Sequence, residues 1–357
     1  MLTIRNIYND GYTNEFVNDF IYKKSPRYVF GTNELAQKIA EAMDVDGFIN
    51  TYGTISTFLG KKCISSLDDV PEDALVINCV ISWKVKEINK TLSYYQFRYL
   101  DATSFITKAN LDIDLFHFTG WKDDINSHFK EYENVYDLLA DKKSKNTFFN
   151  LINYKISGDL RYLACFDDLR PDQYFEDFLN LPPNPTFADI GGFQGETSIK
   201  FIERYPDYNA IYFFEPEISN LNLAKKVLSP YANIQFFPIG LFNRKGTLSF
   251  ISDGSSSKIS NSSSESSIHV DCLDNIVNTK IDFIKMDIEG AEGDAIDGMK
   301  NTIQNYHPAL AVCVYHKPDD FRILTRKILN IRNDYTLYMR HYSAGVDETV
   351  MFFIPQK

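Results

Sequence analysis

The sequence has no apolar run long enough to span a bilayer, and its N-terminus has no basic stretch followed by an apolar one. We therefore expect no membrane span and no signal peptide, and we expect a cytoplasmic protein. Positive charge is also scarce, because 37 Lys and Arg residues face 48 Asp and Glu residues, a net charge of −11. This balance argues against a nucleic-acid partner, whose phosphates would be repelled.

Cysteine is rare and follows no metal-binding or redox spacing. No C-x-x-C pair occurs among the five residues, which are Cys63, Cys79, Cys165, Cys272 and Cys313. An odd number of widely spaced cysteines argues against disulfides and against a thiolate metal site. We expect buried free thiols in a reducing compartment.

The 357 residues suggest about two domains. In the first part, helical runs alternate with the strand-like runs "RYVFG", "GFINTY", "PEDALVINCVI" and "FRYLDATSF", and Asn33 is placed to cap a helix. Such alternation predicts a parallel α/β sheet. We assign residues 1–143 to a smaller Rossmann-like domain and residues 144–185 to a helical linker that ends at the prolines of "PPNP".

Residues 186–357 alternate more clearly. The strand-like runs are "TFADI", "AIYFFE", "IQFFPIG", "IDFIKMD" and "ALAVCVYH", with helices such as "ISNLNLAKKVL" and "AIDGMKNTIQNY" between them. Two last runs, "YTLYMRHYS" and "ETVMFFIP", predict an antiparallel hairpin at the sheet edge. This doubly wound pattern is typical of a class I methyltransferase. The serine-rich segment 252–267 is expected to be a flexible loop or a mobile lid.

The segment "FADIGGFQGETS", residues 187–198, lacks the glycine spacing of a dinucleotide-binding turn and the Lys-Ser or Lys-Thr of a P-loop. It still predicts a strand, a tight turn at Gly191 and Gly192, and a helix that begins near Gly195. Asp189 at the strand end would repel a pyrophosphate. It would attract a ligand that carries an ammonium and a sulfonium.

Further ligand contacts are expected where the next strands end. Glu215 follows Gly195 by twenty residues and is placed to accept hydrogen bonds from both ribose hydroxyls. Gly240 and Leu241 follow the third strand and could flank an adenine. A ribose, an adenine, an amino-acid end and a positive sulfur together describe S-adenosylmethionine.

Acids and histidines follow the later strands. Asp287, Glu289 and Glu292 come after "IDFIKM", His316 after the next strand, and His341 lies on the hairpin. We predict that His316 is a general base, because its unperturbed pKa lies near neutrality, that Asp287 orients it, and that His341 is the alternative base. The same groups could hold a divalent metal instead. No tight spacing such as H-x-x-x-H supports that alternative, and we expect no metal.

Residues 170–357 resemble the FkbM-type methyltransferase family of S-adenosylmethionine-dependent O-methyltransferases. The matching segments are "DQYFEDFLNL", "FADIGGFQGETS", "FFEP", "HVDCLDNI", "FIKMDIEGAE", "ALAVCVYHKP", "LYMRHY" and "ETVMFFIP". The resemblance implies S-adenosylmethionine as cofactor. It also implies, as acceptor, a sugar hydroxyl of a capsule, a lipopolysaccharide or a glycosylated metabolite. It adds Tyr174, Thr197, Pro216 and Asp271 to the cofactor-binding set and Glu289 to the catalytic set.

The first domain resembles the nucleotide-sugar-binding domain of bacterial sugar acetyltransferases, through "FGTNELA" and "GFINTYG". Asn33 stands where a second glycine would allow close phosphate approach, and Asn50 where an acid is usual. We interpret this domain as an acceptor-positioning or dimerisation module, which leaves open a nucleotide-sugar acceptor and a homodimer. Two other functions stay open: a nicotinamide-dependent oxidoreductase of sugar metabolism, and a non-catalytic protein that retains a cofactor pocket.

Overall fold

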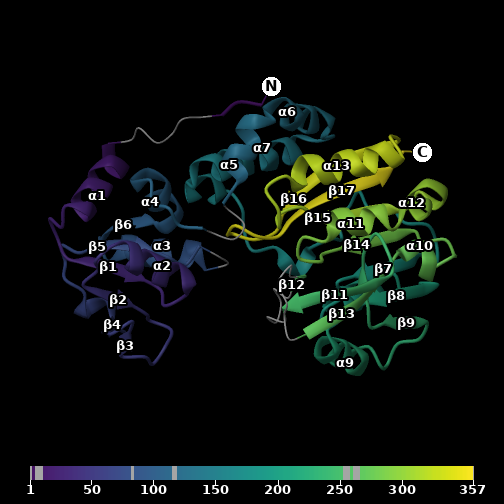
Figure 1. The fold of residues 1–357 in the computed structure, drawn as a ribbon, viewed down its shortest axis with the longest axis horizontal. Helices are drawn as coiled ribbons and strands as arrows, with labels where there is room; N and C mark the ends of the chain where they lie inside the picture. Colours follow the sequence, from purple (N-terminus) through teal and green to yellow (C-terminus); the bar gives the residue numbers. More distant parts are fainter. Residues whose placement is uncertain are drawn as a thin grey trace. The chain divides into compact units, whose positions relative to one another are not determined.

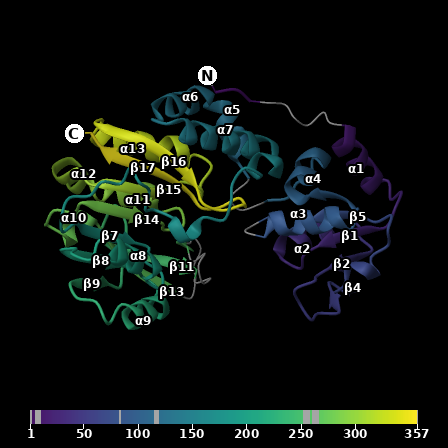
Figure 2. The same cartoon turned by 180° about the vertical axis from the view of Figure 1, so that it is seen from behind.

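The computed structural model describes residues 2–4, 11–81, 84–114, 119–251, 258–259 and 266–356. The chain forms two compact units, each drawn in Figures 1 and 2. Residues 1–127, 146–170 and 341–347 belong to the first unit, and residues 128–145, 171–340 and 348–357 to the second. The predicted limits at 143 and 185 divide the chain into consecutive pieces, whereas these units interleave along it.

A six-stranded sheet forms the centre of the first unit, in the order β3-β4-β2-β1-β5-β6. All neighbouring strands are parallel except the short β3, which is antiparallel to β4. The strands are β1 (Arg27–Phe30), β2 (Gly47–Ile49), β3 (Thr57–Phe58), β4 (Lys61–Ile64), β5 (Leu75–Asn78) and β6 (Arg98–Asp101). Its helices include α1 (Gly11–Ile21), α2 (Glu34–Ala42), α3 (Val85–Tyr94), α4 (Ala102–Ala109) and α5 (Trp121–Ser127).

Local chemistry explains where these elements begin. The predicted cap is confirmed, because Asn33 Oδ1 accepts a hydrogen bond from the Ala36 amide at 3.0 Å.

The prediction of a single strand over "FRYLDATSF" is wrong. Asp101 ends β6, and its Oδ1 accepts the Ser104 amide at 2.8 Å, so α4 begins there. Helices cover both faces of the sheet, as the two apolar cores on either side of β1 show.

The second unit contains a seven-stranded sheet in the order β16-β17-β15-β14-β7-β8-β9. Strands β15, β14, β7, β8 and β9 are parallel, and β17 runs antiparallel to β15. This confirms the predicted Rossmann-like sheet with an antiparallel edge. The strands are β7 (Thr186–Ile190), β8 (Ala210–Phe214), β9 (Ile234–Phe237), β14 (Phe283–Met286), β15 (Ala309–Cys313), β16 (Tyr335–His341) and β17 (Thr349–Pro355).

Helices surround this sheet. They are α6 (Phe129–Leu138), α8 (Glu196–Arg204), α9 (Ile218–Val227), α10 (Leu273–Ile276), α11 (Glu292–Asp297), α12 (Lys300–Tyr306) and α13 (Asp320–Ile331), while α7 (Lys142–Ser157) runs from the second unit into the first. Figure 1 shows α11 and α13 over the sheet, and α8 comes into view from behind in Figure 2. Helix α13 packs against α6, α11 and α12.

A second, four-stranded sheet was not predicted. Its order is β10-β13-β11-β12, formed by β10 (Gly240–Leu241), β11 (Gly246–Ile251), β12 (Lys258–Ile259) and β13 (Ser266–Asp271). The prediction of one strand over "IQFFPIG" is therefore wrong, since β9 ends before Pro238 and β10 pairs with β13. Most of the serine-rich segment, and with it the predicted loop or lid, lies outside the described residues.

The helix predicted over "AIDGMKNTIQNY" is two helices, α11 and α12. Gly298 ends α11, and a Cβ atom there would lie 2.0 Å from the carbonyl oxygen of Phe242, so the chain needs glycine at this approach. None of the helices in the described part of the chain has the length and apolar character needed to cross a membrane.

All five cysteines are free thiols. Cys63, Cys79 and Cys313 are buried, as predicted. Cys165 is exposed and Cys272 is half-buried, so the prediction of burial is wrong for these two.

Candidate active site

The turn after β7 contains glycines at positions where neighbouring atoms of the same chain leave no room for a side chain. Gly191 has φ +73°, and a Cβ atom there would lie 1.9 Å from the carbonyl oxygen of Asp287. A Cβ atom on Gly192 would lie 2.3 Å from the ring of Phe213. Gly195, with φ +98°, precedes the first residue of α8. The turn therefore lies tightly against the ends of β14 and β8.

Asp189 lies behind this turn and is fully buried. Its Oδ2 accepts a hydrogen bond from the Ser198 hydroxyl at 2.7 Å, and its Oδ1 lies 3.3 Å from Lys285 Nζ. Burial lowers the pKa of Lys285, but the charges of Asp189 and Asp287 outweigh burial and raise it. The expectation that Asp189 directly attracts a cationic ligand is therefore corrected, because Lys285 already compensates its charge. The pair also holds the turn, since Lys285 Nζ donates to the Gly191 carbonyl oxygen.

Glu215 follows the last residue of β8 and is 7% exposed. Its Oε2 accepts the Phe193 amide at 3.0 Å and its Oε1 accepts the Glu217 amide at 2.8 Å. Burial raises the pKa of this carboxyl to about 7, although both hydrogen bonds oppose that shift. Each oxygen has a further lone pair, so the carboxylate can still accept bonds from a ligand.

The other predicted cofactor contacts lie on neighbouring elements. Gly240 and Leu241 form β10, and its pairing with β13 sets Leu241 beside Asp271. Asp271 Oδ1 accepts the Cys272 amide and the Asn275 side-chain amide, both at 2.8 Å. Thr197 lies half-buried in the first turn of α8, and Pro216 lies half-buried directly after Glu215.

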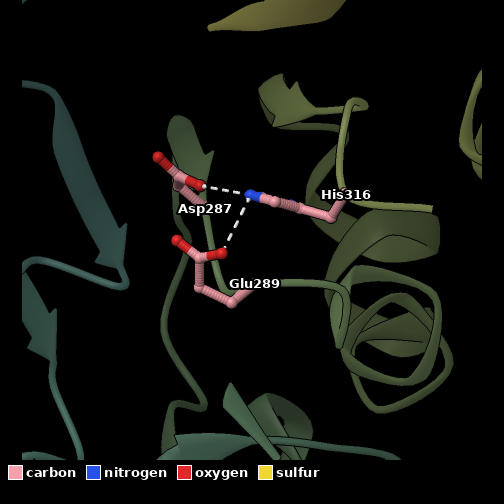
Figure 3. A group of neighbouring side chains, drawn as sticks. All are labelled: Asp287, Glu289 and His316. Carbon is pink, nitrogen blue, oxygen red and sulfur yellow. Dashed lines mark ion pairs between the residues drawn. The ribbon is translucent and has the colours of Figure 1, made fainter. Parts of the chain in front are cut away.

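Three side chains converge where β14 and β15 end. Asp287 directly follows β14, Glu289 lies two residues on, and His316 follows β15. His316 Nε2 lies 3.4 Å from Asp287 Oδ1 and 3.5 Å from Glu289 Oε2 (Figure 3). The side chain of His316 is 1% exposed, and those of Asp287 and Glu289 are 22% and 18% exposed. The structure therefore brings three of the four predicted catalytic residues together.

Buried groups behind this cluster hold it in place. Glu292 Oε1 lies 2.9 Å from His316 Nδ1 and accepts the Ile288 amide at 2.9 Å. Burial lowers the pKa of His316, but Glu292, Asp287 and Glu289 outweigh burial and raise it to about 10. The reason for predicting His316 as the base, a pKa near neutrality, is therefore not met. Three carboxylates keep this imidazole protonated at neutral pH.

Tyr174 joins the same cluster. It is 5% exposed, and its hydroxyl donates to Asp287 Oδ2 at 3.1 Å. This contact makes the residue a support for Asp287, whereas the sequence predicted a cofactor contact. Burial and the charge of Asp287 raise the pKa of the tyrosine well above its usual range.

His341, the alternative base, is assigned to the first unit. It is buried, its Nε2 lies 2.9 Å from the Gly345 carbonyl oxygen, and its ring packs on Phe166. Burial lowers its pKa to about 4. The site in the second unit is therefore built without it.

Sequence reasoning gave no role to Lys285 and only a general one to Glu292. A lysine inside the apolar run "DFIKMD" is a signal for a buried ion pair, because an unpaired lysine in a central strand is costly. Glu292 was noted as a third acid, but its contact with the inner nitrogen of His316 depends on how α11 packs beside β15.

Residues 189–338 match the family model described as the methyltransferase FkbM domain. A crystal structure of methyltransferase FkbM from Methylobacillus flagellatus superimposes with a TM-score of 0.77 at 20% identity, over 96% of this chain and 93% of that one. A search of curated proteins finds no match.

Two further solved structures align with half of the chain. An rRNA methylase from Streptococcus thermophilus covers 50% of this chain and 93% of its own, with 15% identity and a TM-score of 0.34. Fibrillarin from Aeropyrum pernix, solved with S-adenosyl-L-methionine, covers 52% and 72%, with 10% identity and a TM-score of 0.32. Both scores are too low to support an inference.

The match to the family model confirms the resemblance that the sequence motifs indicated. It begins at Asp189, in β7 just before the glycine turn, and it includes Glu215, Asp287, Glu289 and His316. The Methylobacillus structure shares the fold over nearly the whole chain, including the first unit. Residues 189–338 of this chain therefore match a methyltransferase FkbM domain.

Proposed function

We propose that this protein is an S-adenosylmethionine-dependent O-methyltransferase that acts on a carbohydrate hydroxyl. The cofactor fits the residues present: Glu215 offers two carboxylate oxygens to a ribose, and the Gly191 turn leads into the N-terminus of α8. S-adenosylmethionine supplies a methyl group on a positively charged sulfur. The observation that carries the proposal is the cluster of Asp287, Glu289 and His316 next to that turn.

Transfer to a hydroxyl needs a group that takes the proton as the oxygen attacks. With His316 protonated, we assign that role to the carboxylates of Asp287 and Glu289. His316 Nε2 faces both carboxylates, and Glu292 fixes the ring from its other nitrogen. For the hydroxyl oxygen to attack the methyl group on the sulfonium, the hydroxyl must be aligned and a proton acceptor must be in position.

The first unit offers a place for the acceptor. It contains a cavity of about 530 Å³, within the range of small-molecule sites. The lining combines aromatic, cationic and acidic side chains, among them Tyr12, Tyr99, Lys86, Arg161, Asp101 and Asp159. Both cations are already paired, Lys86 with Asp167 and Arg161 with Asp159. The aromatic and polar groups of the lining support a sugar as ligand and acceptor handling as the role of this unit.

The test is methyl transfer from methyl-labelled S-adenosylmethionine to a panel of sugars, nucleotide sugars and oligosaccharides, with products identified by mass spectrometry. We expect an O-methyl product in one carbohydrate class. His316→Ala should lower kcat by up to about 10²- to 10⁴-fold, the contribution of the proton-accepting carboxylates that His316 positions, and leave cofactor affinity nearly unchanged. His307→Ala, which removes a histidine beside Asp334 elsewhere in the same unit, is the matched control. A near-normal rate in His316→Ala would refute the assignment of the cluster.

A further inference from the structure

Hydrogen-bonded ion pairs do not explain the distances from His316 Nε2 to the carboxylates of Asp287 and Glu289. Charge-assisted N–H···O bonds are about 2.7–2.9 Å long. His316 Nδ1 meets this with Glu292, at 2.9 Å, but Nε2 lies 3.4 and 3.5 Å from the two outer carboxylates. The outer distances are too long for two direct bonds, although all three groups point to one place (Figure 3).

The same spacings fit ligands of one metal ion. Two ligands each about 2.1 Å from a shared ion lie about 3.0 Å apart at a right angle and about 3.4 Å apart at a tetrahedral angle. One ligand atom from each of Asp287, Glu289 and His316 lies within 4.8 Å of the other two. The three donors can therefore contact a single ion with small adjustments.

Two further observations point to a ligand at this place. Asp287 Oδ1, which faces His316, is a buried atom that accepts no hydrogen bond from the described residues. His316 is held through Nδ1 by the buried Glu292, the arrangement that orients histidine ligands in metal sites. Asp287 is held in turn by the Tyr174 hydroxyl.

We propose that Asp287, Glu289 and His316 bind a divalent metal cation at the carboxyl ends of β14 and β15. The cation takes the place of the proton on His316 Nε2, so its binding releases one proton. Two carboxylates and one imidazole favour a cation such as Mn²⁺. Three protein ligands leave coordination positions for acceptor oxygens, so the cation would hold the hydroxyl next to the methyl donor. The sequence predicted no metal because the ligands come from two strands and lack close spacing along the chain.

The metal site itself does not depend on the proposed function. Only the assignment of an acceptor hydroxyl to its free coordination position rests on that function. Each carboxylate has two oxygens, so binding a cation through one oxygen leaves the other to take the hydroxyl proton. Lys285, whose pKa the charge of Asp287 helps to raise, is already paired with Asp189.

The test uses the full-length chain, freed of metal with a chelator and titrated with Mn²⁺, with free Mn²⁺ followed by electron paramagnetic resonance. Wild type should bind one Mn²⁺ per chain. Glu289→Gln, which keeps size and hydrogen bonding, should weaken binding by at least about 100-fold, and Glu292→Gln should weaken it by about 10- to 100-fold. His307→Gln, in the other histidine–aspartate pair of the unit, should bind Mn²⁺ as wild type does.

Melting temperature and S-adenosylmethionine affinity, measured on the same samples, show whether Glu289→Gln remains folded. Absence of stoichiometric Mn²⁺ binding to wild type, or equal binding by a folded Glu289→Gln protein, overturns the metal site. If a carbohydrate is methylated and Mn²⁺ does not bind, the inference fails and the proposed function stands. If both bind but no carbohydrate is methylated, the metal site stands and the acceptor assignment fails.

Discussion

At the residue scale, Glu215 shows how burial can tune a cofactor contact. Its carboxyl accepts two backbone amides, yet burial raises its pKa to about 7, well above the usual 4.5. A neutral carboxyl is therefore populated just below neutral pH when no ligand is bound. A ribose that donates to this group prefers the ionised form, so ligand binding and proton loss are linked.

We expect the affinity for S-adenosylmethionine to fall as pH decreases through 7. About a tenth of the carboxyl is ionised one pH unit below its pKa, so binding should be up to about tenfold weaker at pH 6 than at pH 8. Calorimetric titration at both values measures the effect. Glu215→Gln should weaken the cofactor by about 1–3 kcal/mol at pH 8 and remove the pH dependence. An unchanged slope in this variant would mean that another group titrates.

The residues of the site differ in how far the sequence could predict them. Asp287 and His316 were expected to lie together, because parallel neighbours end at the same edge of a sheet. The pairing of Asp189 with Lys285 was not predictable in the same way. It follows from the register of β7 with β14, which sets Asp189 directly beside Lys285, and register between distant segments cannot be read from one chain.

At the element scale, the turn after β7 joins the cofactor side of the site to the catalytic cluster. The carbonyl oxygen of Asp287 lies against Gly191, so the turn and the end of β14 position each other. A side chain at Gly191 would have to push β14 away. This contact is backbone against backbone, and no rotamer change can relieve it.

Gly191→Ala should destabilise the second unit by more than about 2 kcal/mol and abolish methyl transfer, because strain at positive φ adds to a clash at 1.9 Å. Thermal unfolding measures the loss. Gly60→Ala is the matched control, since Gly60 has the same φ of +73° and a Cβ atom added there would have no atom within 4 Å. It should cost only about 1–2 kcal/mol. Equal losses in the two variants would show that the contact with Asp287 contributes nothing.

Strands that form continuous apolar runs were predictable from the sequence, and strands without such a run were not. The apolar runs of β7, β8, β14 and β15 are buried on both faces and stood out in the sequence. Strands β11 and β13 flank a serine-rich segment, whose composition concealed their pairing. The two-residue strands β3 and β10 are too short to show a period at all.

At the scale of the whole molecule, two units share the chain in an interleaved order. Residues 341–347 join the first unit after β16, although both flanking strands belong to the sheet of the second. Local patterns cannot reveal such a return, because it depends on contacts with residues far away in the sequence. Because the first unit includes residues 341–347, we do not expect residues 1–170 to fold and bind a ligand without the rest of the chain.

The proposed division of labour gives the acceptor to the first unit and the cofactor to the second. Lys86 on α3 lines the cavity of the first unit and forms an ion pair with Asp167 at 2.7 Å. Lys86→Glu should raise KM for a phosphate-bearing acceptor by about tenfold or more, equivalent to about 1.4 kcal/mol, because it places a negative charge in the lining of the cavity. Affinity for S-adenosylmethionine should stay within about twofold.

Lys90→Glu makes the same charge change on the same helix, at an exposed residue outside the lining of the cavity. The two variants therefore have the same net charge, and any general effect of that charge on encounter with an anionic acceptor appears in both. A larger KM in Lys86→Glu alone supports acceptor binding in the cavity. Equal KM values in both variants would remove the cavity from the acceptor path, and a loss of cofactor affinity in Lys86→Glu would show that the two units do not divide the ligands in this way.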